Sequence, residues 1–366
     1  MSNDGVRVFE STQTEPHARG VEFGRANAAA VLRTVSHYRE LFTSRGLGAD
    51  ELQDLSVRAL SAITDYAPAV ASEIAGIAQG AGAADSEIAM INARTEILAH
   101  AGIHTAPECS TVVQLSDDGV VAQQNWDWYT IFEEDWLVWR FTTDSGVTVE
   151  TMTEYGVVAK AGCNSTGVGV LFNILHHDTD GRTIGAPVHV IARRVLTEAV
   201  DVASALTIIA AARRSASTTM TVVSGGPGNA AVAVSVEIAP DDLGYVFADD
   251  TGLLLHTNHF LSSPLSLGDR EHREYPDTVL RYDALRRRLG GPGEVGAAEV
   301  AAALSDTTGG PLALCCRPDP NLPGDFQYQT LAHIDLDIAE GRLNVTPFGP
   351  PGSNTKSPRK EETHHV

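Results

Sequence analysis

The hydrophobic pattern of this chain changes its period at Cys109, and this change limits the folds that the chain can adopt. Before Cys109, apolar side chains recur at three- and four-residue spacings, which is typical of amphipathic helices. After it, apolar and polar residues alternate in short β-branched runs, which is typical of strands. The pattern therefore predicts a mainly helical segment over residues 1–108 and a sheet-rich part over residues 109–348.

The expected elements follow from the same periods. After a short lead strand and loop, helices are predicted over residues 17–47, 51–67, 68–80 and 86–100, and later over 187–198, 201–213, 277–289 and 294–304. Strands are predicted over residues 109–115, 120–128, 136–143, 147–155, 157–163, 167–175, 218–224, 230–238, 244–248, 253–257, 327–337 and 342–347. Strand groups interrupted by a helix pair favour an α+β fold with layered packing. The tail over residues 349–366, rich in Pro, Gly, Ser and charges, is expected to be disordered.

Charge and cysteine content exclude several classes of partner. The formal net charge of −21 argues against nucleic acid and anionic membrane as partners, whereas a small anionic ligand needs only a local positive site. No apolar run reaches about 18 residues, so no membrane span is expected, and the polar N-terminus predicts no signal peptide. The four cysteines have no Cys-x-x-Cys spacing for zinc, and the vicinal pair Cys315-Cys316 would strain a disulfide. We therefore expect a cytoplasmic protein with reduced thiols.

A predicted hairpin joins the two polar groups that stand out most. Cys109 opens an apolar run that ends at Leu115, and Asp117-Asp118-Gly119 is a hairpin turn signal. The return strand contains Asn125-Trp126-Asp127-Trp128, so a hairpin of this length can bring Asp127 near the level of Cys109. A thiol and a carboxylate on paired strands are unusual for a plain core.

Six short motifs occur in one order along most of the chain. They are Cys109-Ser110-Thr111, Gln124-Asn125-Trp126-Asp127-Trp128, Gly162-Cys163-Asn164-Ser165-Thr166-Gly167 with Asn173, Gly185-Ala186-Pro187 with Arg193, His256-Thr257-Asn258-His259, and Cys316-Arg317. Together they resemble the cysteine branch of the N-terminal nucleophile (Ntn) hydrolases, in particular the family of the acyl-coenzyme A:6-aminopenicillanate acyltransferase. The resemblance implies a four-layer αββα sandwich, with residues 1–108 as a helical pro-segment and residues 109–348 as the catalytic chain.

The resemblance also implies how such a chain works. The precursor cuts itself before the cysteine, here between Glu108 and Cys109, and the freed cysteine is both the N-terminus and the nucleophile. Its own α-amino group, with a pKa of about 7.7–8.0, can take the thiol proton, so no histidine partner is needed. Relatives often have glycine before the cysteine, where strain is easier to accommodate; Glu108 departs from that pattern and adds a charge. Taken alone, Cys109 could also be a buried cysteine that fills the strand start.

Three further positions match functional positions of that family. The resemblance makes Asp127 the group that orients the new amine, Asn258 the oxyanion donor and Arg317 a site arginine that pairs with Asp127 or holds a substrate carboxylate. Trp126 and Trp128 are candidates to wall an apolar acyl pocket. The structural alternatives are a turn carboxylate for Asp127, a surface arginine for Arg317 and core packing for the tryptophans.

The sequence leaves alternatives open for ligands and activity. His256 and His259 have a His-x-x-His spacing but no third ligand cluster, so we expect no metal. No resident cofactor is expected, although acyl-coenzyme A is allowed as an acyl donor, and a homo-oligomer is allowed. The expected substrate is an acyl amide or thioester of a small amine or amino acid. The alternatives are an amidase that only hydrolyses and has no coenzyme A site, or an uncleaved, non-catalytic protein that binds a small ligand.

Overall fold

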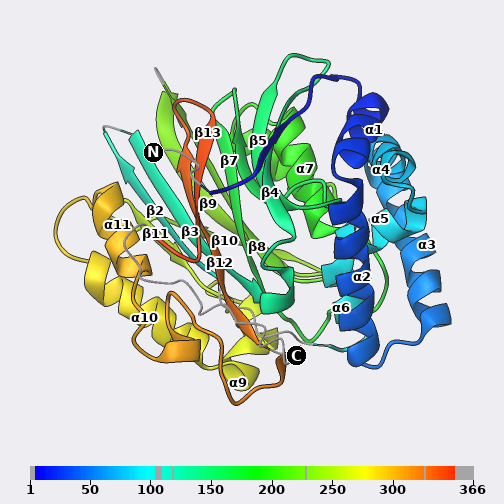
Figure 1. The fold of residues 1–366 in the computed structure, drawn as a ribbon. Coiled ribbons are helices and arrows are strands. Elements are labelled where there is room, and N and C mark those ends of the chain that lie inside the picture. The colour runs from blue at the N-terminus through cyan, green and yellow to red at the C-terminus, as the bar shows by residue number, and fades with distance from the viewer. Residues whose placement is uncertain (1–4, 104–108, 118, 227–228, 325–326, 351–366) are drawn as a thin grey trace, which may run out of the picture.

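Two β-sheets lie face to face at the centre of the molecule (Figure 1). The computed structural model describes residues 5–103, 109–117, 119–226, 229–324 and 327–350. In the larger sheet the strands follow the order β1 (Val8–Glu10), β4 (Trp136–Thr142), β5 (Thr148–Glu154), β6 (Ala161–Asn164), β7 (Val168–Ile174), β8 (Thr218–Gly226), β9 (Asn229–Ile238) and β10 (Leu243–Phe247). In the smaller sheet the order is β11 (Leu253–His256), β2 (Ser110–Ser116), β3 (Gly119–Tyr129), β12 (Tyr328–Asp337) and β13 (Arg342–Pro347).

Helices cover the outer face of each sheet. The larger sheet contacts α7 (Val188–Glu198) and α8 (Val202–Ala210), whereas the smaller sheet contacts α10 (Asp277–Leu289) and α11 (Ala297–Leu304). The α+β class and the four-layer αββα order are therefore confirmed (Figure 1). The short helix α9 (Glu271–Glu274) was not predicted, because one turn is too short to show a period.

The N-terminal helices form a group beside α7 in Figure 1. They are α1 (Pro16–Ala26), α2 (Ala28–Ser44), α3 (Ala49–Tyr66), α4 (Pro68–Ala81), α5 (Asp85–Asn92) and α6 (Arg94–His100). This group is tied to the sheets at its start, because β1 pairs in parallel with β4 while the other paired strands are antiparallel. As predicted, Pro68 is at the first turn of its helix.

Two predicted helices are each broken into two, and a buried asparagine stands at each break. The side-chain amide of Asn27 donates to the Phe23 carbonyl at 3.0 Å, between α1 and α2. That of Asn92 donates to the Ile88 carbonyl at 2.8 Å and to the Gly156 carbonyl at 2.9 Å. A side-chain amide that occupies the i−4 carbonyl competes with the helical ladder, and an apolar period does not reveal this competition.

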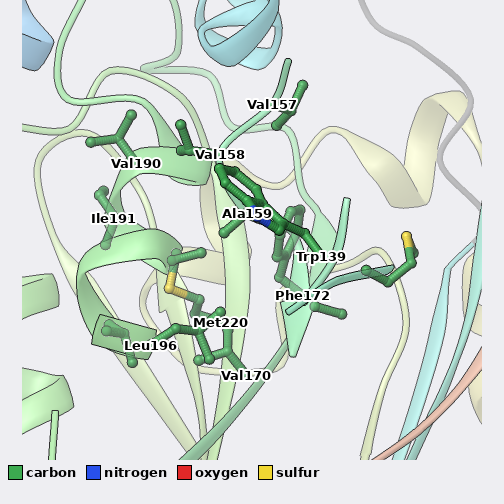
Figure 2. Close-up of a cluster of buried hydrophobic side chains, with 14 of the residues drawn as sticks. Trp139, Val157, Val158, Ala159, Val170, Phe172, Val190, Ile191, Leu196 and Met220 are labelled. Atoms are coloured by element: carbon green, nitrogen blue, oxygen red, sulfur yellow. The ribbon is translucent and has the colours of Figure 1, made fainter. Parts of the chain in front are cut away.

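One part of the main hydrophobic core fills the space between the larger sheet and α7. Figure 2 shows Ile191 and Leu196 of α7, Val170 and Met220 of the sheet, and Phe172 and Trp139 in one cluster. Val157, Val158 and Ala159, just before β6, are fully buried in the same cluster. The segment that leads into β6 is therefore held firmly by packing on the sheet.

Buried ion pairs connect the N-terminal helices to the rest of the chain. Helices α1 and α4 approach closely through glycines: a Cβ added to Gly20 would lie 2.2 Å from the Glu73 carbonyl oxygen. Glu73 accepts a hydrogen bond from Arg19 Nε at 2.6 Å. Both of its carboxylate oxygens also accept from Arg193 Nη2 of α7, at 2.5 and 2.6 Å. All three side chains are at most 3% exposed, so their charges depend on one another.

We expect Glu73→Gln to lower the free energy of unfolding by about 3–5 kcal/mol, because it leaves two buried guanidinium groups without their carboxylate. The matched control is Glu198→Gln, which removes a partner from Arg194 at a side chain that is 45% exposed. That change should stay within about 1 kcal/mol. Urea unfolding followed by circular dichroism measures both, and equal effects would refute the assignment of Glu73 as a buried anchor.

Candidate active site

The thiol of Cys109 lies at the start of β2, beside the return strand β3. The strands pair so that Ser110 lies opposite Asn125, and the backbone N–H of Asp127 lies close enough to the Cys109 thiol to lower its pKa. Side chains alternate along a strand, so Cys109 and Thr111 face the larger sheet whereas Ser110 faces α10. Contacts agree with this, because Thr111 Oγ1 donates to Asn173 of β7 at 2.8 Å and Ser110 Oγ accepts from Arg281 of α10 at 3.0 Å. The structure thus brings Cys109 and Asp127 together.

In the uncleaved chain the Cys109 thiol is a weak acid. It is 4% exposed, and burial, reinforced by the charge of Asp127, raises its pKa to about 12. Lys160 and Arg281 lower the pKa, but by less. Because the thiolate is the nucleophile, this thiol needs a proton acceptor before it can react at neutral pH.

Asp127 is a buried carboxyl group with unused hydrogen-bonding capacity. Burial raises its pKa to about 7, while Thr330, Arg281, Cys316 and Arg317 lie near enough to lower it. Neither carboxyl oxygen accepts a hydrogen bond of ordinary geometry from the described residues. A buried carboxylate with open positions is able to bind a cation or a donor that arrives later.

Asn258 follows β11 and is held by three hydrogen bonds. Its Oδ1 accepts from Arg281 at 3.0 Å, its Nδ2 donates to the Ile174 carbonyl at 2.9 Å, and its backbone N–H donates to Thr278 Oγ1 at 2.8 Å. The side-chain amide has two N–H bonds, so one stays available beyond the bond to Ile174. The amide is therefore fixed in orientation, as an oxyanion donor requires.

Arg281 is a site residue that sequence reasoning missed. Its guanidinium donates to the Cys109 carbonyl at 3.1 Å, to Ser110 Oγ at 3.0 Å and to Asn258 Oδ1 at 3.0 Å, and its Nε bonds Asp277 at 3.2 Å. Arg281 thus links the backbone of Cys109 to the side chain of Asn258. In the sequence, Arg281 resembles any other arginine of a predicted helix, so no local pattern indicated that it belongs to the site.

Lys160 is the second site residue that sequence reasoning missed, although one feature of the sequence could have indicated it. The chain has only three lysines, at 160, 356 and 360, and Lys160 follows an apolar run. Its Nζ lies 3.0 Å from Glu154 Oε2 and 3.7 Å from the centre of the Trp126 ring. Its charge lowers the pKa of the Cys109 thiol, so it belongs to the same site.

The remaining predicted residues divide into two groups. Arg317 is half-buried and close enough to lower the pKa of Asp127. Trp126 faces the site through Lys160, whereas Trp128 donates from Nε1 to the Tyr38 hydroxyl at 3.1 Å, within the packing between β3 and α2. Glu108 lies outside the described residues.

The rings of His256 and His259 are engaged separately. His256 bonds Glu237 at 3.0 Å and the Thr257 carbonyl at 2.7 Å, whereas His259 bonds the hydroxyls of Thr257 and Thr278, each at 3.1 Å. Across the part of the chain that the structure describes, no three His, Cys, Asp or Glu side chains are grouped to hold a metal ion. In the same part, no helix is long and apolar enough to span a bilayer.

Comparison with known proteins gives the family. Residues 115–344 match the model of the acyl-coenzyme A:6-aminopenicillanic acid acyl-transferase family. The chain is 32% identical over 290 residues to the acyl-coenzyme A:6-aminopenicillanic-acid-acyltransferase 40 kDa form of Emericella nidulans, which covers 78% of this chain and 76% of that protein. The chain belongs to this family. The residues matched by the family model include Asp127, Asn258 and Arg317, but the matched range begins after Cys109.

The predicted family resemblance is thereby confirmed, and so is the prediction of an enzyme, because the family model and the curated relative are both named as acyltransferases. Two solved structures are also similar, each at 12% identity over 65% of this chain. They are the Caenorhabditis elegans orthologue of N-acylethanolamine-hydrolyzing acid amidase (TM-score 0.46, 99% of that chain) and penicillin V acylase from Agrobacterium tumefaciens (TM-score 0.41, 82% of that chain).

The raised pKa of Asp127 predicts a pH-dependent stability of the uncleaved chain. The folded state binds the carboxyl proton more tightly than the unfolded state, so stability falls as pH rises from about 4 to about 7. In a Cys109→Ala background, which keeps one chain, Asp127→Asn should therefore change the urea midpoint little at pH 4 and raise it at pH 8. The control is Asp241→Asn, at a side chain that is 66% exposed. It should leave the urea midpoint nearly unchanged at both pH values. An effect of Asp127→Asn that is equal at both pH values would contradict the assignment.

Proposed function

We propose that this protein is a self-processing N-terminal cysteine hydrolase or acyltransferase that acts through a Cys109 acyl-enzyme. The observation that carries the proposal is the buried Cys109 thiol beside the Asp127 carboxyl group, whose oxygens have no ordinary hydrogen-bond partner among the described residues. Cleavage of the Glu108–Cys109 bond would create an α-ammonium group next to Asp127. An ammonium partner would use the open carboxylate positions and lower the pKa of Asp127.

The reaction then follows from the positions of the groups. The α-amine of Cys109 takes the thiol proton, and the thiolate attacks the carbonyl carbon of an acyl amide or thioester. The Asn258 amide donates to the oxygen that becomes negative, while Arg281 keeps that amide oriented. The C–N or C–S bond breaks, and the leaving group takes the proton held by the amine. Water or an amine then attacks the acyl-enzyme and restores the thiol.

The substrate class in this proposal is a small N-acylated amine or amino acid, with acyl-coenzyme A as an alternative acyl donor and no resident cofactor. The family match and the relative from Emericella nidulans, named for acyl transfer to 6-aminopenicillanic acid, support it. Arg317, close to Asp127, is the proposed contact for a substrate carboxylate. Trp126 is the proposed aromatic wall, and the contact between Trp128 and Tyr38 favours a packing role for Trp128.

We expect mass spectrometry of purified protein to show a fragment that begins at Cys109, and Cys109→Ala to remain one chain. Cys163→Ala is the control, because Cys163 is a buried thiol of β6 and should leave cleavage unchanged. The fragments should elute together until they are denatured, since Glu73 and Glu154 bind groups on both sides of the cut. Intact wild-type protein with full amidase activity would refute the N-terminal amine mechanism.

We expect Asn258→Ala to lower kcat about 10²–10³-fold with a smaller change in KM, because it removes a contact made in the transition state. Asn258→Asp keeps the acceptor for Arg281 but removes the donor, and it should lose activity similarly. Melting curves show whether each variant folds. If both folded variants keep kcat and KM within about threefold, Asn258 is not the oxyanion donor.

A further inference from the structure

The proposed function leaves one step without a base. After cleavage, the α-amine of Cys109 can take the thiol proton, but in the uncleaved chain that nitrogen is part of a peptide bond. The thiol is then buried, with a pKa raised to about 12, so some other group must accept its proton before the first attack. The inference that follows rests on the proposed function and concerns this group.

Lys160 is placed in the site by a rigid stretch of backbone. Val157, Val158 and Ala159, which precede it, are fully buried in the cluster around Phe172 (Figure 2). Lys160 itself is 5% exposed, and its Nζ lies over the Trp126 ring at 3.7 Å. The amine therefore faces the inter-sheet side of β3, the side toward which Cys109 points.

One carboxylate is shared by two cations and a hydroxyl. Glu154 Oε2 accepts from Arg94 at 2.6 Å and from Lys160 at 3.0 Å, and Glu154 Oε1 accepts from the Tyr38 hydroxyl. Arg94 stays protonated at any relevant pH, so it already balances the charge of Glu154. The proton on Lys160 is therefore the one that this cluster can release.

The surroundings of Lys160 favour its neutral form. Burial lowers its pKa to about 7; Glu154 and Cys109 raise it and Arg94 lowers it further. At neutral pH a large share of the molecules would thus hold a free amine close enough to Cys109 for the charges of the two groups to affect each other. The titratable groups around this amine, taken by element, are Tyr38 of α2, Arg94 of α6, Cys109 before β2, Asp127 of β3, Glu154 of β5 and His189 of α7.

We propose that Lys160 accepts the proton of the Cys109 thiol in the uncleaved chain and so starts self-cleavage. The S–H bond breaks and an N–H bond forms, which gives a thiolate and an ammonium. The thiolate attacks the carbonyl carbon of the peptide bond before Cys109, and the Lys160 ammonium returns the proton to the departing nitrogen as the C–N bond breaks. Water then hydrolyses the thioester, which leaves a carboxyl group on the first fragment and a free thiol and amine on the second.

Asp127 is the rival base, and charge balance disfavours it. Transfer to the Asp127 carboxylate would form a buried thiolate with no new cation beside it. Transfer to Lys160 forms a thiolate and an ammonium together, and the ammonium lowers the pKa of the thiol. This difference in charge favours Lys160 as the proton acceptor during cleavage. The cleaved enzyme does not need Lys160 in this role, because the α-amine of Cys109 is then free.

The test compares cleavage half-times of Lys160→Met and Lys160→Arg with that of wild type, by gel after cell-free synthesis at fixed pH. Both variants should cleave at least about 10²-fold more slowly, because neither side chain can accept a proton at neutral pH. Lys160→Met leaves Glu154 with Arg94 and Tyr38, so the fold should survive. The matched control is Arg19→Met, which removes one of two cations from the buried Glu73 and should cleave at the wild-type rate.

Two further measurements separate a base from a structural group. A small amine such as methylamine should speed cleavage of Lys160→Ala at least about tenfold, and tetramethylammonium, which has no lone pair to accept a proton, should not. The wild-type rate should rise with pH through about 7 and then level off, whereas the rate of Lys160→Arg should continue to rise above pH 8. If Lys160→Met loses its melting transition, the variant does not fold, and the pH dependence of the wild-type cleavage rate becomes the test. A wild-type cleavage rate that does not change from pH 5 to 9 overturns the proposal.

The outcomes distinguish this inference from the function on which it rests. Wild type that never cleaves overturns the proposed processing and this inference together. Wild type that cleaves, with folded Lys160→Met equally fast, overturns only the role of Lys160. Slow Lys160→Met without amine rescue of Lys160→Ala assigns Lys160 a packing role and overturns the proton transfer.

Discussion

The antiparallel pairing of β2 with β3 is the interaction on which the candidate site depends. It places the backbone N–H of Asp127 close enough to the Cys109 thiol to lower the pKa of that thiol. The alternation of side chains then sends the thiol toward the larger sheet and Ser110 toward α10. A slip of one residue would exchange these faces, so the register of one hairpin determines which groups surround the nucleophile.

Buried carboxylates hold the N-terminal helices on the sheets. Glu73 binds arginines of α1 and α7, Glu154 binds Arg94 of α6, and Asp135 binds Arg33 of α2 at 2.7 Å. Apart from the pair of Glu73 with Arg19, each of these contacts joins residues on opposite sides of the Glu108–Cys109 bond. The segment before that bond therefore belongs to the folded core, and Arg94 and Tyr38 from it bind the same carboxylate as Lys160.

The acid–base state of the site depends on whether the chain is cut. In the intact chain, burial raises the pKa of both Cys109 and Asp127 and lowers that of Lys160, so each group is biased toward its neutral form. A new α-ammonium group would add a further positive charge beside Asp127, to those of Arg281 and Arg317. The same residues would then favour the thiolate through the amine. In the proposed mechanism, Lys160 and then the α-amine of Cys109 accept the thiol proton in succession.

The sequence by itself determined the classes of element, the αββα order through the family resemblance, and the pairing of Cys109 with Asp127. These follow from local periods, turn signals and motif order, all of which are short-range properties of the chain. It did not reveal the helix breaks at Asn27 and Asn92, because these depend on side-chain amides that bind the helix carbonyls. Only the tertiary structure placed Arg281 and Lys160 in the site. Each contacts the nucleophile region from an element far away in sequence, and the ionisation of a buried charge is decided by the neighbours that burial brings to it.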